Sequence, residues 1–254
     1  MRLQDKVAVV TGGGSGFGAG IVEKFVAEGA RVVVADVNLD AAREVAARAG
    51  ELTVAVRADV SRPADVRAML DAAQRHFGDL NILVNNAGVG HVPQPLEGLP
   101  EEEWDRLTAV NMKSIYLAMR EVVPRFKARA PGAGGIRGVV LNMASTAGVS
   151  PRPRLAWYNA SKGWVITATR ACAVELAPFG IRVNALNPVA GETPLLKTFM
   201  GEDTPEIRAK FLSTIPIGRF STPADLANAS CFLCSDEASM ITGVCMEVDG
   251  GRCI

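Results

Sequence analysis

The chain alternates from end to end between short apolar runs and segments with helical spacing. The first run, Val7-Ala8-Val9-Val10, is apolar at every position, which is typical of a parallel strand buried on both faces. Comparable runs recur at 31–36, 52–56, 80–84, 139–143, 181–186 and 244–248. This alternation predicts one α/β domain over residues 1–254, a doubly wound (Rossmann) seven-stranded parallel sheet with helices on both faces.

Capping and breaking residues mark the ends of the expected helices. Asparagine and proline favour the first positions of a helix, and glycine favours the position after its last turn. About six helices are expected on these signals: one that ends at Gly29, and others over 39–49, 63–76, 101–127, 157–177 and from 223 onward.

Two segments interrupt the pattern. Residues 129–138 are rich in glycine and are expected to form a flexible surface loop. Residues 189–217 form a long segment without regular periodicity after the sixth strand, and we expect an irregular, mobile lid over the substrate there.

Composition excludes several function classes. The 254 residues carry 27 basic and 27 acidic side chains, and no Lys/Arg run indicates binding to nucleic acid or to an anionic membrane. No signal peptide and no apolar stretch of ~20 residues is expected, so we predict a cytoplasmic protein without a membrane segment. The chain has five cysteines, all of them late in the sequence. We expect Cys231 and Cys234 to pack within a helix rather than bind metal, and no metal site is predicted.

A glycine-rich motif follows the first predicted strand. Thr11-Gly12-Gly13-Gly14-Ser15-Gly16-Phe17-Gly18 leads directly into a helix. Glycines allow the backbone to turn sharply and to approach a pyrophosphate, and the free N–H groups at a helix N-terminus attract the anion. A glycine cluster alone can be a flexible loop, but its place between a strand and a helix predicts a dinucleotide site.

Asp36, at the end of the second predicted strand, indicates which dinucleotide binds. A carboxylate at this position accepts hydrogen bonds from the adenosine ribose and repels a 2′-phosphate. The next residue, Val37, supplies no positive charge to attract such a phosphate. The sequence therefore favours NAD over NADP.

Tyr158 and Lys162 lie four residues apart in a predicted helix, so they share one face. A phenol titrates near ~10, and it can exchange a proton at neutral pH only where its ionised form is stabilised. A lysine ammonium one turn away can supply that stabilisation. The pair alone is weak evidence, because tyrosine and lysine at this spacing are commonly an exposed surface pair.

Taken together, these motifs resemble those of the short-chain dehydrogenase/reductase family, in its main branch, and the resemblance covers essentially the whole chain. Thr11-Gly12-x-x-x-Gly16-x-Gly18 and Tyr158-x-x-x-Lys162 match the family's two signature motifs. The remaining matches are the Asn-Asn-Ala-Gly motif at residues 85–88, Asn111, and Ser145 thirteen residues before Tyr158.

The resemblance implies four catalytic roles. Tyr158 would exchange the proton with the substrate oxygen, and Lys162 would lower the pKa of Tyr158 and bind the nicotinamide ribose. Ser145 would hold the substrate oxygen, and Asn111 would hold a water behind the lysine. The residues implied for cofactor binding are Gly12, Ser15, Gly16, Phe17, Gly18, Asp36, Asp59, Val60, Asn86, Ala87, Gly88, Tyr158, Lys162, Pro188, Gly191 and Thr193.

The chain departs from the family pattern after the sixth strand. The family has Pro-Gly there, whereas this chain has Val189 after Pro188, with the glycine displaced to Gly191. Thr193 keeps the family's spacing from the proline, so its contact with the carboxamide is still expected. The shape of the adjoining substrate pocket is the feature that this departure affects.

Two groups of residues bear on the substrate. Trp157 and the apolar residues of 195–200 either close over an apolar substrate or serve packing and subunit contact. Arg152 and Arg154 are either solvated loop residues or ligands for an acidic substrate group, and the solvated alternative is the more common one.

The expected function is an NAD(H)-dependent oxidoreductase that interconverts a secondary alcohol and a ketone. The same family also contains 3-oxoacyl thioester reductases and dehydrogenases of sugars and steroids, which the sequence does not separate. A non-catalytic dinucleotide sensor is the alternative from another class, but it would normally lack the tyrosine, lysine or serine. By resemblance the chain is expected to form a homotetramer.

Overall fold

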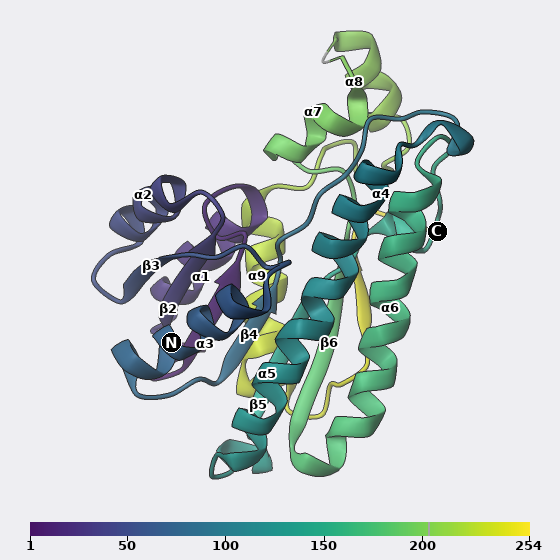
Figure 1. Cartoon of the computed structure of the whole chain (residues 1–254). Coiled ribbons are helices and arrows are strands. Elements are labelled where there is room, and N and C mark those ends of the chain that lie inside the picture. The colour runs from purple at the N-terminus through teal and green to yellow at the C-terminus, as the bar shows by residue number, and fades with distance from the viewer. Residues whose placement is uncertain (203) are drawn as a thin grey trace.

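The computed structural model describes residues 1–202 and 204–254 and contains a seven-stranded, wholly parallel sheet (Figure 1). The spatial order of the strands is β3-β2-β1-β4-β5-β6-β7. The sheet confirms the predicted fold class, and every strand lies within two residues of its expected bounds. The strands are β1 (Val7–Thr11), β2 (Arg31–Asp36), β3 (Thr53–Arg57), β4 (Ile82–Asn85), β5 (Gly138–Met143), β6 (Ile181–Pro188) and β7 (Cys245–Val248).

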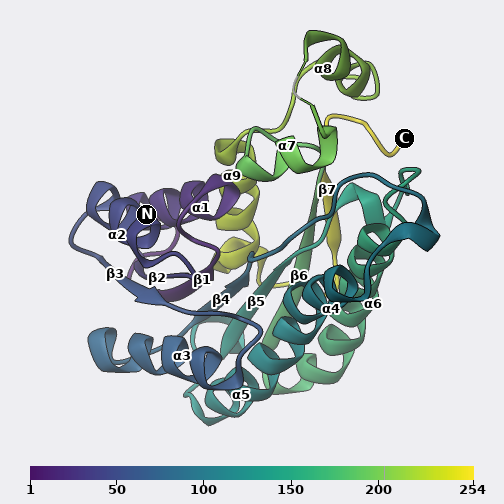
Figure 2. The same ribbon diagram turned by 45° about the horizontal axis from the view of Figure 1, so that its top comes forward.

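Helices cover both faces of the sheet, as Figure 2 shows. One face carries α1 (Gly16–Ala27), α2 (Leu39–Ala49) and α9 (Pro223–Cys234), and the other carries α3 (Pro63–Phe77), α5 (Ser114–Ala128) and α6 (Ala156–Leu176). Strand β1 shows why its sequence is apolar at every position. Val7 and Val9 point into one core and Ala8 and Val10 into the other, and all four are fully buried. No helix in the described part of the chain is long and apolar enough to cross a membrane.

The strand order reverses between β1 and β4. The chain runs from β1 outward to β2 and β3, and it then returns to the other side of β1 with β4. In sheets of this kind, ligands bind beyond the carboxyl ends of the strands at the reversal. The segments that follow β1 and β4 are the glycine-rich loop and Asn86, so the fold brings the predicted nucleotide motifs together.

The predicted helix over 101–127 is confirmed in its extent, since residues 101–128 are helical without a break, and is wrong only in its regularity, because a π-helical turn lies within it. The structure has α4 (Glu101–Thr108), a π-helical turn (Ala109–Lys113) and then α5. The wider turn arises where the side chain of Asn111 is hydrogen-bonded to a neighbouring loop instead of facing solvent.

The predicted irregular segment 189–217 is also wrong in part, because it contains two short helices, α7 (Pro194–Met200) and α8 (Pro205–Leu212). Each begins with proline at its first position, and Thr204 caps α8 through its side chain. Leu196 and Met200 pack with Ile215 and Phe220 in a small separate core. Both helices lie beyond the carboxyl ends of the strands (Figures 1 and 2).

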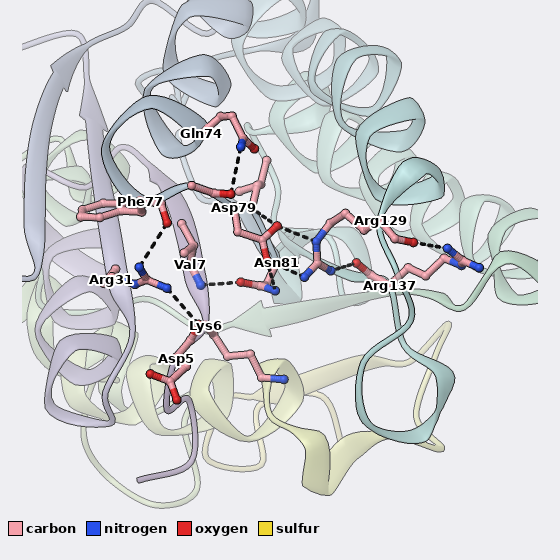
Figure 3. Close-up of polar contacts among 12 residues, drawn as sticks. Asp5, Lys6, Val7, Arg31, Gln74, Phe77, Asp79, Asn81, Arg129 and Arg137 are labelled. Atoms are coloured by element: carbon pink, nitrogen blue, oxygen red, sulfur yellow. Dashed lines mark hydrogen bonds and ion pairs between the residues drawn. The ribbon is translucent and has the colours of Figure 1, made fainter.

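The glycine-rich segment 129–138 lies at the opposite end of the sheet from the site. Its tip, residues 131–135, is exposed, as expected of a surface loop. Its first residue is anchored, because the Arg129 guanidinium donates two hydrogen bonds of 2.7 Å to the Asp79 carboxylate (Figure 3). Arg129 and Arg137 also donate to each other's backbone carbonyl groups. This polar network ties the start of β5 to the segment before β4.

Candidate active site

The glycine-rich loop lies against the start of α1 at glycines where a side chain would be strained or would clash. Gly12 has a φ of +62°, a conformation that residues with a Cβ rarely adopt. A Cβ at Gly18 would lie 2.0 Å from the carbonyl oxygen of Gly12, so α1 approaches the loop only because residue 18 is glycine. The N-cap Ser15 makes no side-chain capping bond. The first N–H groups of α1 therefore remain available to an anion.

A cavity of about 760 Å³ lies beside this loop, within the size range of cofactor pockets. All predicted cofactor residues except Gly18 and Gly191 line it: Gly12, Ser15, Gly16, Phe17, Asp36, Asp59, Val60, Asn86, Ala87, Gly88, Tyr158, Lys162, Pro188 and Thr193. The cavity thus reaches from Asp36 at the end of β2 to Tyr158 and Lys162 on α6. Gly18 serves the helix–loop contact instead, and Gly191 borders a second cavity.

Two carboxylates on the cavity wall are fixed by backbone N–H groups. The Asp36 carboxylate accepts hydrogen bonds of 2.9 Å from the N–H groups of Gly14 and Asn38. Asp59 accepts bonds from the Ser61 hydroxyl at 2.6 Å and from the Ser61 N–H at 2.9 Å, and the hydroxyl bond holds the pKa of Asp59 below its usual value. Each carboxylate is therefore oriented by these hydrogen bonds before any ligand arrives.

Tyr158 and Lys162 are both buried at the inner end of the cavity, with 6% and 5% of their surfaces exposed. Burial raises the pKa of Tyr158 from 10.0 to about 12 and lowers the pKa of Lys162 from 10.5 to about 8. Lys162 Nζ donates to the carbonyl oxygen of Met143 at 2.9 Å and lies 5.9 Å from the centre of the Tyr158 ring. Since both shifts disfavour charge, the pair is held in a dry site where added charges act strongly.

Ser145 and Arg152 act on Tyr158 in the direction opposite to burial. A hydrogen bond with Ser145 and the positive charge of Arg152 both lower the pKa of Tyr158. Ser145 Oγ also accepts a bond of 3.1 Å from the N–H of Ala147, because Ser145 caps a short 3₁₀ turn after β5. This turn fixes the hydroxyl beside the phenol.

Asn111 connects α6 to the loop after β4. Its side chain accepts from the N–H of Val89 and donates to the carbonyl oxygen of Val89, both at 2.9 Å. It also donates to the Ser161 hydroxyl at 3.1 Å, and Ser161 donates to the carbonyl oxygen of Tyr158 at 2.8 Å. A Cβ at Gly88 would lie 3.4 Å from Lys162 Nζ and 3.5 Å from Asn111 Oδ1, so the lysine and the asparagine meet over a glycine.

Comparison with known proteins decides the family. Residues 12–252 match the family model described as enoyl-(acyl carrier protein) reductase. The chain is 47% identical to the 4-formylbenzenesulfonate dehydrogenase TsaC1/TsaC2 of Comamonas testosteroni, over 99% of both chains. It is 37% identical to the galactitol 2-dehydrogenase of Agrobacterium fabrum, also over 99% of both. A crystal structure of 3-ketoacyl-(acyl-carrier-protein) reductase from Brucella melitensis with NADH superimposes with a TM-score of 0.93, at 52% identity, over 99% of this chain and 100% of that one.

The chain belongs to the short-chain dehydrogenase/reductase family. This confirms the predicted family, and with it the predicted function at the level of an oxidoreductase that uses a nicotinamide dinucleotide. The choice between NAD and NADP, the substrate and the assembly depend on residues particular to this chain.

Packing explains the departure of this dehydrogenase/reductase from the family pattern after β6. A Cβ at Gly191 would lie 2.2 Å from the Phe17 ring and 2.8 Å from the Ser221 hydroxyl, so the displaced glycine makes room for an aromatic ring. Val189 is buried in the small core beneath α7. Thr193 lines the large cavity beside Gly16, and its contact with the carboxamide stays a prediction.

A second cavity of about 70 Å³ adjoins the same tyrosine, on the side of α7 and α8. Ser145, Tyr158 and Arg152 line it, together with Leu195, Leu196, Phe199 and Phe211. The Phe199 ring packs on Tyr158 with ring centres 4.7 Å apart. Other candidates for this pocket lie elsewhere: Trp157 donates to the carbonyl oxygen of Leu96 and packs on Trp104, Met200 packs in the small core, and Arg154 is exposed.

Sequence reasoning missed Ser161 and Phe211. Ser161 stands one turn after Tyr158 on the same buried face, and that spacing is a signal that could have revealed its contact with Asn111. Phe211 lies in a segment without periodicity and meets Arg152 only through the tertiary fold. No signal in the sequence marks that contact.

Proposed function

We propose that this chain is an NAD(H)-dependent oxidoreductase that interconverts a secondary alcohol and a ketone, with Tyr158 as the acid and base. The observation that carries the proposal is the position of Tyr158 on the shared wall of two cavities. The larger has the size and the lining for a dinucleotide, and the smaller contains Ser145 and apolar side chains. A substrate oxygen held between Ser145 and Tyr158 would face both cavities.

The residues of the large cavity fit a nicotinamide dinucleotide. The glycine loop and the uncapped start of α1 would hold the pyrophosphate, Asp36 the adenosine ribose, and Lys162 the other ribose. When bound, the nicotinamide ring supplies the hydride acceptor or donor of the reaction. Thr193 and Pro188 stand on the same wall as Tyr158 and would orient that ring.

Tyr158 would move the proton, and Ser145 would hold the substrate oxygen. With a pKa of about 12 the phenol is protonated at neutral pH, which suits donation to a ketone oxygen. For the reverse direction the pKa must fall from about 12 to about 7, which corresponds to about 7 kcal/mol of stabilisation of the phenolate. The value of about 12 already includes the lowering effects of Ser145 and Arg152, so the further stabilisation would come from other positive charges, of which a protonated Lys162 lies one turn away.

NAD is the preferred dinucleotide in this proposal. The Asp36 carboxylate is oriented by two backbone N–H groups, and an oxygen so placed would accept hydrogen bonds from ribose hydroxyls and repel a 2′-phosphate. Val37, next to it, is exposed and uncharged.

Segment 189–217 is proposed to act as a lid through α7 and α8. A cavity of about 70 Å³ is far smaller than the 300 Å³ or more of ordinary ligand sites. Phe199 of α7 and Phe211 of α8 close it, and α8 contributes no fully buried residue. An outward movement of these helices would admit the substrate, and their return would exclude water from Tyr158.

Assembly into a homotetramer is proposed from one face of α6. Ala160, Trp164, Thr167, Ala171 and Val174 are all exposed and recur at a spacing of four, three, four and three residues, so they line one side of the helix. Tyr116 on the neighbouring α5 is exposed as well. A helix face this apolar is typical of a contact between subunits.

Tyr158→Phe tests the function. The variant removes only the hydroxyl, so reduction of a ketone should fall about 1000-fold while the dissociation constant for NADH, measured by fluorescence, stays within about three-fold. Tyr116→Phe is the matched control, since Tyr116 is the other tyrosine of the chain and is exposed.

The substrates tested in this assay should include simple ketones, sugars and a 3-oxoacyl thioester, because relatives include a galactitol dehydrogenase and a 3-ketoacyl reductase. Turnover retained by Tyr158→Phe would disprove the role of the phenol, and NADH binding with no turnover on any substrate would favour a sensor.

A further inference from the structure

The small cavity holds one cationic side chain whose hydrogen-bonding groups the proposed reaction does not use. Arg152 lines the cavity together with Ser145 and Tyr158, and its Nη2 atom is buried without a hydrogen-bond partner. The guanidinium makes no ion pair and no side-chain hydrogen bond with any residue of 1–202 or 204–254. Because a buried N–H group without a partner is costly, an arginine in this state is prepared to bind an acceptor.

The position of Arg152 is fixed by its surroundings. Its guanidinium carbon lies 4.4 Å from the centre of the Phe211 ring of α8, and its backbone carbonyl oxygen accepts a bond of 2.7 Å from Asn159 of α6. Stacking on an aromatic face restricts the plane of a guanidinium and leaves its edge free for hydrogen bonds. Arg154, two residues later, is exposed and shares none of these contacts.

A second arginine increases the positive charge at this end of the cavity. Arg252, near the C-terminus, donates to the Ser150 hydroxyl at 3.1 Å, and its Nε atom is also buried without a partner. Burial is the main cause that lowers the pKa of Arg152, and the positive charge of Arg252 is the second. The two guanidinium groups therefore repel each other. Neither forms an ion pair with a carboxylate in the described part of the chain. The groups that face Arg152 and favour its charge are Tyr158 and Cys253, both neutral at pH 7.

We propose that Arg152 binds an anionic oxygen group, a carboxylate or a sulfonate, on the substrate. The substrate would then carry its carbonyl or alcohol carbon at Ser145 and Tyr158, its anionic group at Arg152, and an apolar body between them against Leu155, Phe199 and Phe211. The inference rests on the proposed function and narrows its substrate class. The name of one relative, 4-formylbenzenesulfonate dehydrogenase, describes a compound with this combination of groups.

Matched ketones test the inference. Reduction by NADH is measured for 4-acetylbenzoate, 4-acetylbenzenesulfonate and the neutral 4-methylacetophenone, which differ only in the group opposite the carbonyl. We expect wild-type kcat/KM to be higher for at least one anionic ketone, and Arg152→Leu to lower that value by about 30- to 100-fold relative to the neutral ketone. Arg152→Gln should show the same relative loss, and Arg154→Leu should show none.

The ratio between the anionic and neutral ketones separates binding from other roles of Arg152. Loss of its charge also raises the pKa of Tyr158, but that change affects every ketone equally and shifts the pH profile of all three. Equal losses for charged and neutral ketones in both variants would disprove the inference while the proposed function stands. No turnover of any ketone by the wild type, with NADH bound, would instead disprove the proposed function. NADH titration and thermal unfolding establish that each variant is folded.

Discussion

Single residues in this enzyme carry opposing demands of chemistry and stability. Lys162 is buried and ionisable, and burial lowers its pKa from 10.5 to about 8. The protonated form that would stabilise the Tyr158 phenolate is therefore the form that burial disfavours. Such residues are expected at functional sites, where the chemistry requires a charge whose burial destabilises the fold.

Lys162→Met should stabilise the folded protein at neutral pH. The unfolded chain keeps the lysine proton up to about pH 10.5, whereas the folded chain releases it near pH 8. Between these values the unfolded state binds more protons, so the lysine's penalty, about 3 kcal/mol below pH 8, disappears as the pH rises. Urea unfolding of both proteins from pH 7 to 10 measures this. The variant's advantage should shrink across that range, whereas Lys210→Met, an exposed control, should show no such trend. An advantage that does not change with pH would contradict the burial of a charged amine.

Asp36→Asn should weaken the proposed preference for NAD. The substitution keeps the size of the side chain but removes the negative charge that would face the ribose, so a 2′-phosphate would be repelled less. The ratio of kcat/KM with NADP to kcat/KM with NAD should rise about 10- to 100-fold, given partial screening by solvent. Asp40→Asn, on the exposed start of α2, is the control and should leave the ratio unchanged. If both variants behave alike, Asp36 is not the residue that selects the dinucleotide.

Secondary-structure elements differ in how far the sequence predicted them. Most of the strands were predicted closely because burial on both faces makes them apolar runs, whereas the edge strands β3 and β7 are only partly buried. The π-helical turn at Asn111 was not predicted, because it depends on hydrogen bonds to Val89, which is remote in sequence. Helices α7 and α8 are too short for periodicity to show, and only their threonine-proline starts signal them. Most of the residues expected to bind the cofactor line the large cavity, because they follow strand ends and glycine motifs that the sequence shows, whereas the small cavity depends on side chains that meet only in the fold.

Phe199→Ala tests the part played by α7. The Phe199 ring lies on Tyr158 and helps to close a cavity of about 70 Å³, so its removal should enlarge the space for the substrate. For a ketone with a large group beside the carbonyl, KM should fall about ten-fold relative to KM for a small ketone. The large group would fill the space of the removed ring and replace its apolar contacts. Phe179→Ala, half-exposed at the end of α6, is the control. An unchanged ratio of the two KM values would place the substrate elsewhere than under α7.

At the scale of the whole molecule, two layers of function follow from one topology. The reversal of strand order between β1 and β4 places the dinucleotide motifs together, and the return of the chain through β6 places α7 and α8 beside Tyr158. The first layer depends on backbone geometry and was readable from glycine spacing. The second depends on the side chains that line the small cavity, nearly all of them from residues 145–211. The names of relatives that share the first layer describe different substrates.

Val174→Asp tests the proposed assembly. Val174 is 80% exposed in the single chain, so aspartate there should barely alter the stability of a monomer. If the apolar face of α6 is a subunit contact, the same change buries a charge without a partner and should cost several kcal/mol per contact. Four chains of 26.8 kDa give a tetramer of about 107 kDa, and sedimentation or light scattering should find that mass for the wild type and a smaller species for the variant. Leu52→Asp, on the far edge of the sheet beside β3, should leave the mass unchanged. A wild type that sediments as a monomer, or a Val174→Asp variant with the wild-type mass, would exclude this face of α6 as the contact.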